Sequence, residues 1–190
     1  MKKTKYQNNY RVSSSRAIWH DYNGGIYFVT ICTKDRVHYF GNIETFQETS
    51  LQPIMKLTKI GLYADEQLKN IQKHYPYAEI PLWVVMPNHI HAVVVIDGSK
   101  TPYDKRNVET FPETSLQKSV EVATKMQSWL SIVIRQFKQS ITRFARQNNV
   151  PFAWQSRFYD RIIRKTDDMN LIAEYIENNV VRWEFDELHE

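Results

Sequence analysis

The stretch PLWVVMPNHIHAVVVI, residues 81–96, decides the fold of this chain. It contains two apolar runs joined by the turn-forming pair Pro87-Asn88, a pattern that predicts a β-hairpin. Residues 93–96 are apolar on both faces of the second strand, which predicts a central strand covered on both sides. The hairpin therefore belongs to the middle of a buried sheet.

Hydrophobic periodicity places the other elements on either side of this hairpin. Runs of β-branched and aromatic residues predict strands, and apolar residues at helical spacing predict helices. The strands are expected at 26–33 and 158–164, the helices at 53–73, 120–148 and 167–179, and a polar loop at 97–118. The order β-α-β-β-α-β-α predicts an α+β fold, a ferredoxin-like β-α-β-β-α-β antiparallel sheet with an added C-terminal helix that is free to cover its second face.

Length and composition indicate one globular domain. With 190 residues and 42% hydrophobic content, the chain can bury a core without disulfide bonds. The single cysteine, Cys32, excludes an internal disulfide framework and fits a reducing compartment. No apolar leader follows the basic N-terminus, and no apolar run is long enough to span a bilayer. We expect a cytoplasmic, nucleoid-associated protein without a membrane partner, built from a basic arm at 1–16 and one domain at 17–190.

Basic residues gather in two zones that contain no carboxylate. Residues 1–20 hold five Lys or Arg, residues 122–159 hold six, and residues 160–190 reverse the sign with nine acids against four Lys or Arg. This distribution favours a polyanion partner such as nucleic acid over a merely uneven solvated surface. The candidate DNA contacts lie opposite the apolar stripe of the helix at 120–148 and in the arm: Arg135, Lys138, Arg143, Arg146, Lys3, Lys5 and Arg11.

A pair of histidines opens the second strand of the hairpin. His89 and His91 flank Ile90, and residues i and i+2 of a strand point to the same face. Two imidazoles can therefore bind one divalent ion and leave positions open for a substrate. The alternative is a pair of core histidines that are hydrogen-bonded to the backbone.

The last helix brings two polar side chains to its packing face. Tyr175 and Asn179 are four residues apart, so they project together. The Asn179 carbonyl oxygen would complete a metal site with the histidines, and Tyr175 would lie one turn away as a nucleophile. The alternatives are a packing tyrosine and a C-capping asparagine. Tyr159 is a rival nucleophile in a strand whose alternation suggests packing, and Trp129, Trp154 and Phe158 are candidates for base stacking.

Three segments carry a resemblance to a known family. Residues 24–30 (GGIYFVT), 83–96 (WVVMPNHIHAVVVI) and 154–182 (WQSRFYDRIIRKTDDMNLIAEYIENNVVR) resemble the REP-associated tyrosine transposases. These belong to the His-hydrophobe-His (HUH) superfamily of single-strand DNA transposases of bacterial insertion sequences. The similarity covers most of residues 16–185, so residues 17–190 would form a single HUH transposase domain. One departure is Val180, where the family often has proline.

The resemblance implies a function and a set of roles. It implies metal ligation by His89, His91 and Asn179, a Tyr175 nucleophile, and Mg²⁺ or Mn²⁺ as cofactor. The implied substrate is single-stranded DNA with repetitive palindromic hairpins, which the enzyme cleaves and rejoins through a covalent 5′-phosphotyrosine. An N-terminal basic segment, here 1–16, would read a short tetranucleotide beside the hairpin. The chain would act as a monomer or a homodimer.

Two other hypotheses compete with the transposase. A ferredoxin-like sheet also serves as a non-cleaving single-stranded DNA or RNA-binding module, for which neither chelator nor the loss of Tyr175 would matter. A metal-dependent hydrolase of small phosphoesters would turn over without a covalent intermediate. The segments 44–52 and 109–117 echo one another as ETFQETSLQ and ETFPETSLQ, and no function is assigned to them.

Overall fold

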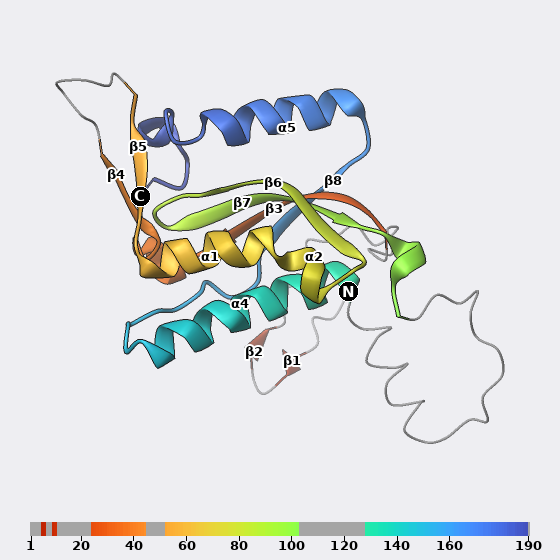
Figure 1. Cartoon of the computed structure of the whole chain (residues 1–190), viewed down its shortest axis with the longest axis horizontal. Helices are drawn as coiled ribbons and strands as arrows, with labels where there is room; N and C mark the ends of the chain where they lie inside the picture. The colour runs from red at the N-terminus through yellow and green to blue at the C-terminus, as the bar shows by residue number, and fades with distance from the viewer. Residues whose placement is uncertain (1–4, 7–8, 11–23, 45–51, 103–127, 190) are drawn as a thin grey trace.

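A four-stranded antiparallel sheet forms the centre of the molecule. The structure, a computed structural model, describes residues 5–6, 9–10, 24–44, 52–102 and 128–189. The strands are β3 (Gly25–Cys32), β6 (Ala78–Val85), β7 (His89–Ile96) and β8 (Tyr159–Ile163), in the order β6-β7-β3-β8 (Figure 1). Strands β6 and β7 are the predicted hairpin, and β7 and β3 lie in the middle. The predicted ferredoxin-like α+β sheet is confirmed.

One face of the sheet packs against two helices. These are α1 (Lys59–Lys69) and α4 (Trp129–Gln147), which lie together beneath the sheet in Figure 1. Alternate residues of the central strands, including Val29, Ile90 and Val94, meet the apolar stripe of α4 in the larger core cluster. Because side chains alternate along a strand, the neighbours of these residues must point to the other face.

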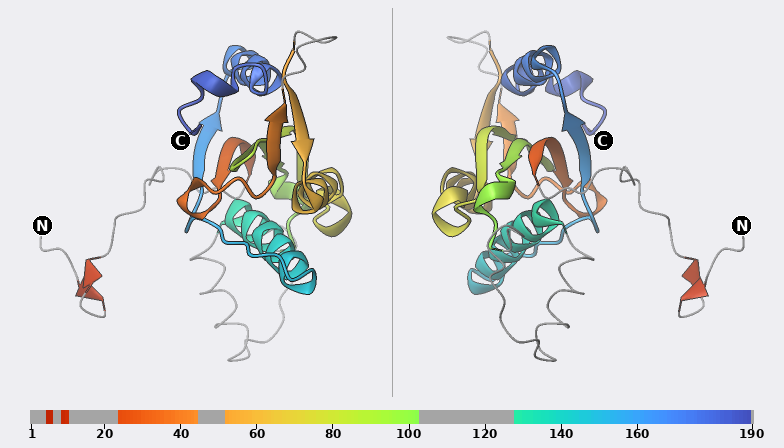
Figure 2. Two further views of the ribbon diagram at one scale, coloured as in Figure 1. Left: turned by 90° about the vertical axis from the view of Figure 1, so that its left-hand side faces the viewer. Right: turned by 90° about the vertical axis from the view of Figure 1, so that its right-hand side faces the viewer.

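The other face of the sheet carries α5 (Thr166–Asn178), the added C-terminal helix. Figure 2 shows α5 on one side of the sheet and the helices α1 and α4 on the other. A smaller apolar cluster holds it there, in which Ile172 and Ile176 contact Val93 and Ile163. Beyond α5 the chain turns through the 3₁₀ segment Trp183–Phe185 and returns toward the start of β7.

One expected helix is wrong at its beginning. Residues 53–73 were expected to be a single helix, whereas Ile54–Leu57 form β5, which pairs with β4 (Gly41–Glu44) in a separate ribbon. Leu57 belonged to the apolar stripe from which the helix was expected, but its side chain packs against the core from an extended backbone. Helix α1 begins only after Thr58, whose hydroxyl caps it by accepting from the Gly61 amide, and a short helix α2 (Ile71–His74) follows.

Several expectations fall on residues outside the described ranges. These are most of the arm at 1–16, residues 120–127 of the second expected helix, and most of both ETF–SLQ segments. Within the arm, the short strands β1 (Lys5–Tyr6) and β2 (Asn9–Tyr10) pair with each other. Among the described helices, none combines the length and the hydropathy that a membrane crossing requires.

Candidate active site

The two histidines of β7 lie on the sheet face that α5 covers. The strand register pairs His89 with Cys32 and His91 with Thr30, both of β3. Both imidazoles are buried, with ring centroids 4.4 Å apart, while Ile90 points into the opposite core cluster. The alternation of the strand thus brings the two rings together, as the spacing predicted.

A chain of hydrogen bonds fixes the protonation of His89. Its Nδ1 lies 2.8 Å from the side-chain oxygen of Asn88, and the amide nitrogen of Asn88 donates to the Leu188 carbonyl at 2.7 Å. Because that amide oxygen can only accept, Nδ1 of His89 must carry the proton and Nε2 must present a lone pair. His89 Nε2 is buried and has no hydrogen-bond partner among the described residues. The imidazole is therefore set up to bind a Lewis acid.

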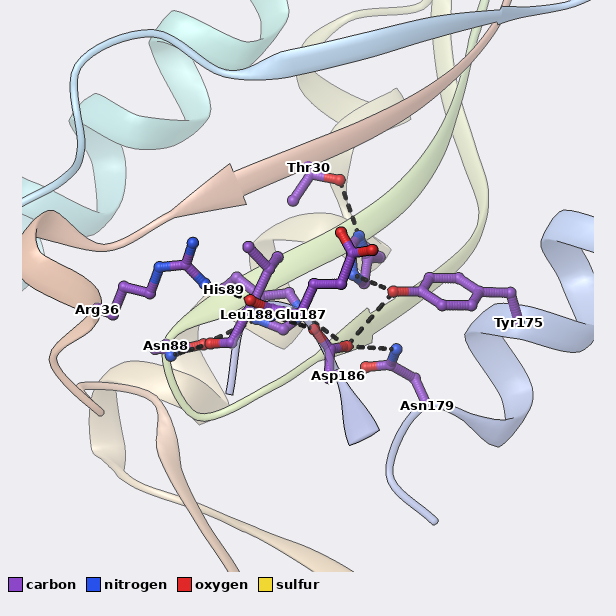
Figure 3. Close-up of polar contacts among 10 residues, drawn as sticks. Thr30, Arg36, Asn88, His89, Tyr175, Asn179, Asp186, Glu187 and Leu188 are labelled. Carbon is purple, nitrogen blue, oxygen red and sulfur yellow. Dashed lines mark hydrogen bonds and ion pairs between the residues drawn. The ribbon is translucent and has the colours of Figure 1, made fainter. Parts of the chain in front are cut away.

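His91 joins the histidine pair to the last helix. Its Nδ1 lies 2.9 Å from the Thr30 hydroxyl, and its Nε2 lies 3.1 Å from the hydroxyl of Tyr175. Figure 3 labels Thr30 and Tyr175 together with Asp186 and Asn179, whose contact is drawn as a dashed line. Phe28 stacks on the His91 ring and meets the Tyr175 ring edge-on. The expected nucleophile and the expected ligand are thus in direct contact within one chain.

Asp186, from the segment after α5, meets these side chains at the centre of the site. Its Oδ2 accepts from Asn179 Nδ2 at 3.0 Å and from the Tyr175 hydroxyl at 3.3 Å, and it lies 3.9 Å from His89 Nε2. Its Oδ1 accepts from the Leu188 amide at 2.7 Å. With its amide nitrogen directed to Asp186, Asn179 leaves its Oδ1 buried and without a partner among the described residues.

These donors fit a divalent cation. One ligand atom from each of His89, His91 and Asp186 lies within 4.8 Å of the others. Two buried atoms, His89 Nε2 and Asn179 Oδ1, find among the residues that the structure describes none of the partners that buried polar groups normally have. A set of two imidazole nitrogens and carboxylate or amide oxygens suits first-row divalent ions and Mg²⁺, and the lack of a thiolate among these four groups disfavours soft ions.

Burial sets the charge state of each group. It lowers the pKa of His89 well below its usual value and that of His91 to about 4, so both imidazoles are neutral near pH 7 and able to ligate. Burial and the charge of Asp186 raise the pKa of Tyr175 to about 12. The phenol is therefore protonated in this arrangement, and a nearby positive charge is what would make it a nucleophile.

Tyr159 lies away from the histidines. It is 60% exposed in β8, and its hydroxyl accepts a hydrogen bond from the side-chain amide of Gln155 at 3.5 Å. Its strand was expected, but the expected packing of its side chain was wrong. The hydroxyl that meets the histidine pair is that of Tyr175.

Comparisons with known proteins identify the fold and the family. An uncharacterized protein of Haemophilus influenzae is 32% identical over 171 residues, which span 87% of this chain and 85% of that protein. The chain belongs to the family of this Haemophilus protein. Searched against models of protein families, the chain matches none of them.

A solved structure extends the comparison to the fold. A REP-associated tyrosine transposase bound to a REP hairpin superposes with a TM-score of 0.52 and 20% identity, over 90% of this chain and 74% of the other. The chain therefore has the fold of the REP-associated tyrosine transposases, the family that its sequence resembles.

The basic face of α4 borders a groove of about 850 Å³, which lies on the side of the sheet opposite to the histidine pair. Its lining includes all four expected DNA contacts of this helix, which are Arg135, Lys138, Arg143 and Arg146. Trp154, Arg157 and Phe158 also line it. The Lys138 ammonium is already engaged, since it donates to the carbonyls of Gln155 and Arg157 at 2.7 and 2.8 Å. Lys3 and Arg11 lie outside the described residues, and Lys5 lies in β1.

Three members of the site were not expected from the sequence: Thr30, Asn88 and Asp186. The contact of Thr30 with His91 depends on the register between β3 and β7, and the hydrophobic periodicity of the sequence does not specify that register. Asn88 was assigned only to the turn, although its side chain orients His89. Asp186 stands in an acidic segment with no spacing signal, and it reaches Tyr175 only because the chain reverses after α5.

Proposed function

We propose that this protein is a metal-dependent tyrosine transposase and endonuclease, which cleaves and rejoins single-stranded DNA at repetitive palindromic hairpins through a covalent 5′-phosphotyrosine. The observation that carries the proposal is the Tyr175 hydroxyl, 3.1 Å from His91 Nε2 and beside two buried ligand atoms that have no hydrogen-bond partner in the described part of the chain. The shared fold with a REP-associated tyrosine transposase bound to a REP hairpin supports the class of reaction and of substrate.

His89 and His91 would hold the cation, with oxygens from Asn179 and Asp186 completing the set. A bound Mg²⁺ or Mn²⁺ ion would supply Lewis-acid stabilisation of the charge that grows on the phosphate oxygens. The chain itself holds both imidazoles neutral and fixes the His89 tautomer through Asn88. Such outer hydrogen bonds orient ligands and are part of a functional metal site.

Tyr175 would carry out the covalent step. Its hydroxyl oxygen attacks the phosphorus, the bond from phosphorus to the 3′ oxygen breaks, and that oxygen leaves with the electron pair. The hydroxyl proton has an acceptor in Asp186 Oδ2 at 3.3 Å. Once the leaving oxygen has taken a proton from water, the products are a phosphotyrosine on the 5′ end of one strand and a free 3′ hydroxyl on the other. Attack of a 3′ hydroxyl on the phosphotyrosine reverses the step and rejoins the DNA.

Every residue that we assign to the site comes from one chain. Tyr175, Asn179, Asp186 and both histidines contact one another within one chain. A monomer that acts in cis is therefore sufficient for this proposal, and a homodimer is the alternative that mass measurement in solution would reveal.

The test is the covalent adduct itself. The protein is incubated with Mn²⁺ and hairpin-forming single strands from the DNA beside its own gene, and intact mass and a denaturing gel are read out. We expect a DNA-sized adduct in the wild type and in Tyr159→Phe, and none in Tyr175→Phe or with chelator. An adduct that survives in Tyr175→Phe overturns the assigned nucleophile. Tight binding that ignores chelator, with no adduct, identifies a non-cleaving nucleic-acid-binding module instead.

A further inference from the structure

A second hollow lies beside the candidate nucleophile and is not used by the proposed chemistry. This cleft of about 450 Å³ separates the edge strand β8 from α5. Eight residues line it: Phe28, Thr30, Tyr159, Asp160, Arg161, Leu171, Ile172 and Tyr175. Its volume falls within the range of small-ligand sites, so it has room for a planar ring system.

The lining of this cleft is mostly apolar and aromatic and therefore suits an aromatic ring, with Asp160 and Arg161 as its charged members. Phe28 is one wall, and the large exposed apolar side chains Tyr159 and Leu171 stand at its mouth, 60% and 66% exposed. Exposed apolar residues that surround a hollow are typical of a binding site, and nucleobases bind to proteins by stacking on aromatic rings. Tyr175, whose hydroxyl lies 3.1 Å from His91 Nε2, also lines the cleft.

The cleft and the basic groove of α4 lie on opposite sides of the sheet and meet at the beginning of the edge strand β8. Phe158 lines that groove and Tyr159 lines the cleft, because successive side chains of an extended segment point to opposite sides. The described residues that line the groove include five cations and no carboxylate, so the groove suits a phosphate backbone. A strand that leaves this groove across the start of β8 would pass directly into the cleft and reach Tyr175.

We infer that the cleft between β8 and α5 receives one unpaired nucleobase of the substrate strand, adjacent to the phosphate that Tyr175 attacks. The inference rests on the proposed function and adds a base-binding subsite to it. A base held there would position the scissile phosphate at the Tyr175 hydroxyl, since a nucleotide's base and phosphate are joined through a single sugar. Tyr159 stacks on the base, and Leu171 closes over its edge.

Photocross-linking places the base. The probe is a hairpin strand from the DNA beside the gene, with 5-iododeoxyuridine at successive unpaired positions. It is irradiated with Tyr175→Phe protein, which cannot cleave it, and cross-linked peptides are mapped by mass spectrometry. We expect cross-links at Tyr159 or Phe28 from one or two adjacent positions. Cross-links found only at Trp154 or Phe158 would place the bases in the basic groove and refute the inference.

Matched variants measure the contribution of the cleft. Leu171→Ala should weaken binding of the same probe about threefold to tenfold, whereas Leu62→Ala, at a similarly exposed leucine of α1, should leave it unchanged. Tyr159→Ala should weaken binding at least about fivefold, and Tyr159→Phe, which keeps the ring, should restore it. Equal binding by Leu171→Ala and Leu62→Ala would remove the cleft from the substrate path.

The Tyr175 adduct, measured in the same samples, separates this inference from the proposed function. Normal adduct formation with no cross-link at Tyr159 or Phe28 refutes the base site and retains the enzyme. Cross-links in the cleft with no adduct on any strand retain the base site and refute cleavage. The absence of both refutes both.

Discussion

The buried histidine pair makes the stability of this protein depend on pH in a predictable direction. An unfolded histidine titrates near 6.5, while burial lowers the pKa of His91 to about 4 in the folded protein. The unfolded chain therefore binds more protons than the folded one between these values. His91 contributes stability fully above its unfolded pKa and loses that contribution as the pH falls toward its folded pKa.

The size of the effect follows from the two pKa values of His91. Linkage predicts that this one residue lowers the free energy of unfolding by about 2.5 kcal/mol between about pH 7.5 and about pH 4.5. His89 acts in the same direction, because its pKa is also lowered by burial. Urea unfolding, followed by circular dichroism at a series of pH values without added metal, measures the fall.

The control is His91→Gln, which cannot titrate at this position. Its absolute stability changes because the contacts with Thr30 and Tyr175 change, so the comparison uses the slope with pH and not the absolute value. We expect the wild type to lose about 2.5 kcal/mol more than the variant over this pH range, whichever of the two is more stable at neutral pH. Curves that stay parallel within about 0.5 kcal/mol would mean that His91 is not held neutral by burial, and the argument for a preformed ligand pair would fail.

Three further predictions concern the site and the groove. Mn²⁺ at about 100 times its Kd should stabilise the wild type by about 2.7 kcal/mol, seen as a rise in Tm, and His89→Ala should abolish the rise; an unchanged rise would place the ion elsewhere. Asp186→Asn should bring the pKa of Tyr175 below its value of about 12, because the neighbouring negative charge is removed. Ultraviolet titration, with Tyr175→Phe as the reference, measures this pKa, and an unchanged pKa would contradict the contact between Tyr175 and Asp186. Lys138→Met should cost about 1–3 kcal/mol of folding stability, because two backbone carbonyls before β8 lose their donor. The exposed Arg143→Met should leave urea unfolding unchanged and reduce the salt dependence of DNA binding; the opposite pattern would exchange the roles of the two cations.

The sheet was predictable because its signals are local. The two apolar runs around Pro87-Asn88 define the hairpin, and the period of two along β7 places both imidazoles on one face whatever the rest of the chain does. The period of 3.6 along α5 likewise brings Tyr175 and Asn179 to one side. The same use of periodicity gave a wrong helix at residues 53–57. A short apolar run fits a strand and a helix equally well until its partner strand, here β4, is known.

The rest of the site depends on contacts between distant segments. Thr30 meets His91 through a strand register, and Asn88 meets Leu188 across a hundred residues of chain. Asp186 is only seven residues beyond Asn179, but its position depends on the turn after α5, for which the sequence offered no capping or periodic signal. Hydrophobic patterns specify faces, and they do not specify which polar group of a distant segment arrives there.

The change in character along one face of β7 indicates that the polar cluster is there for binding. Val93 lies on the same face as His91 and His89, and it packs against Ile172 and Ile176 in an ordinary apolar contact. Continuing that pattern would have stabilised the fold, whereas a buried polar atom without a partner costs about 1–3 kcal/mol. His89 Nε2 and Asn179 Oδ1 both bear that cost within the described structure, and Tyr175 has a raised pKa beside them. A positive ion would satisfy both atoms and lower the pKa of Tyr175, so a divalent cation should stabilise the wild type more than a variant that lacks one of the ligands.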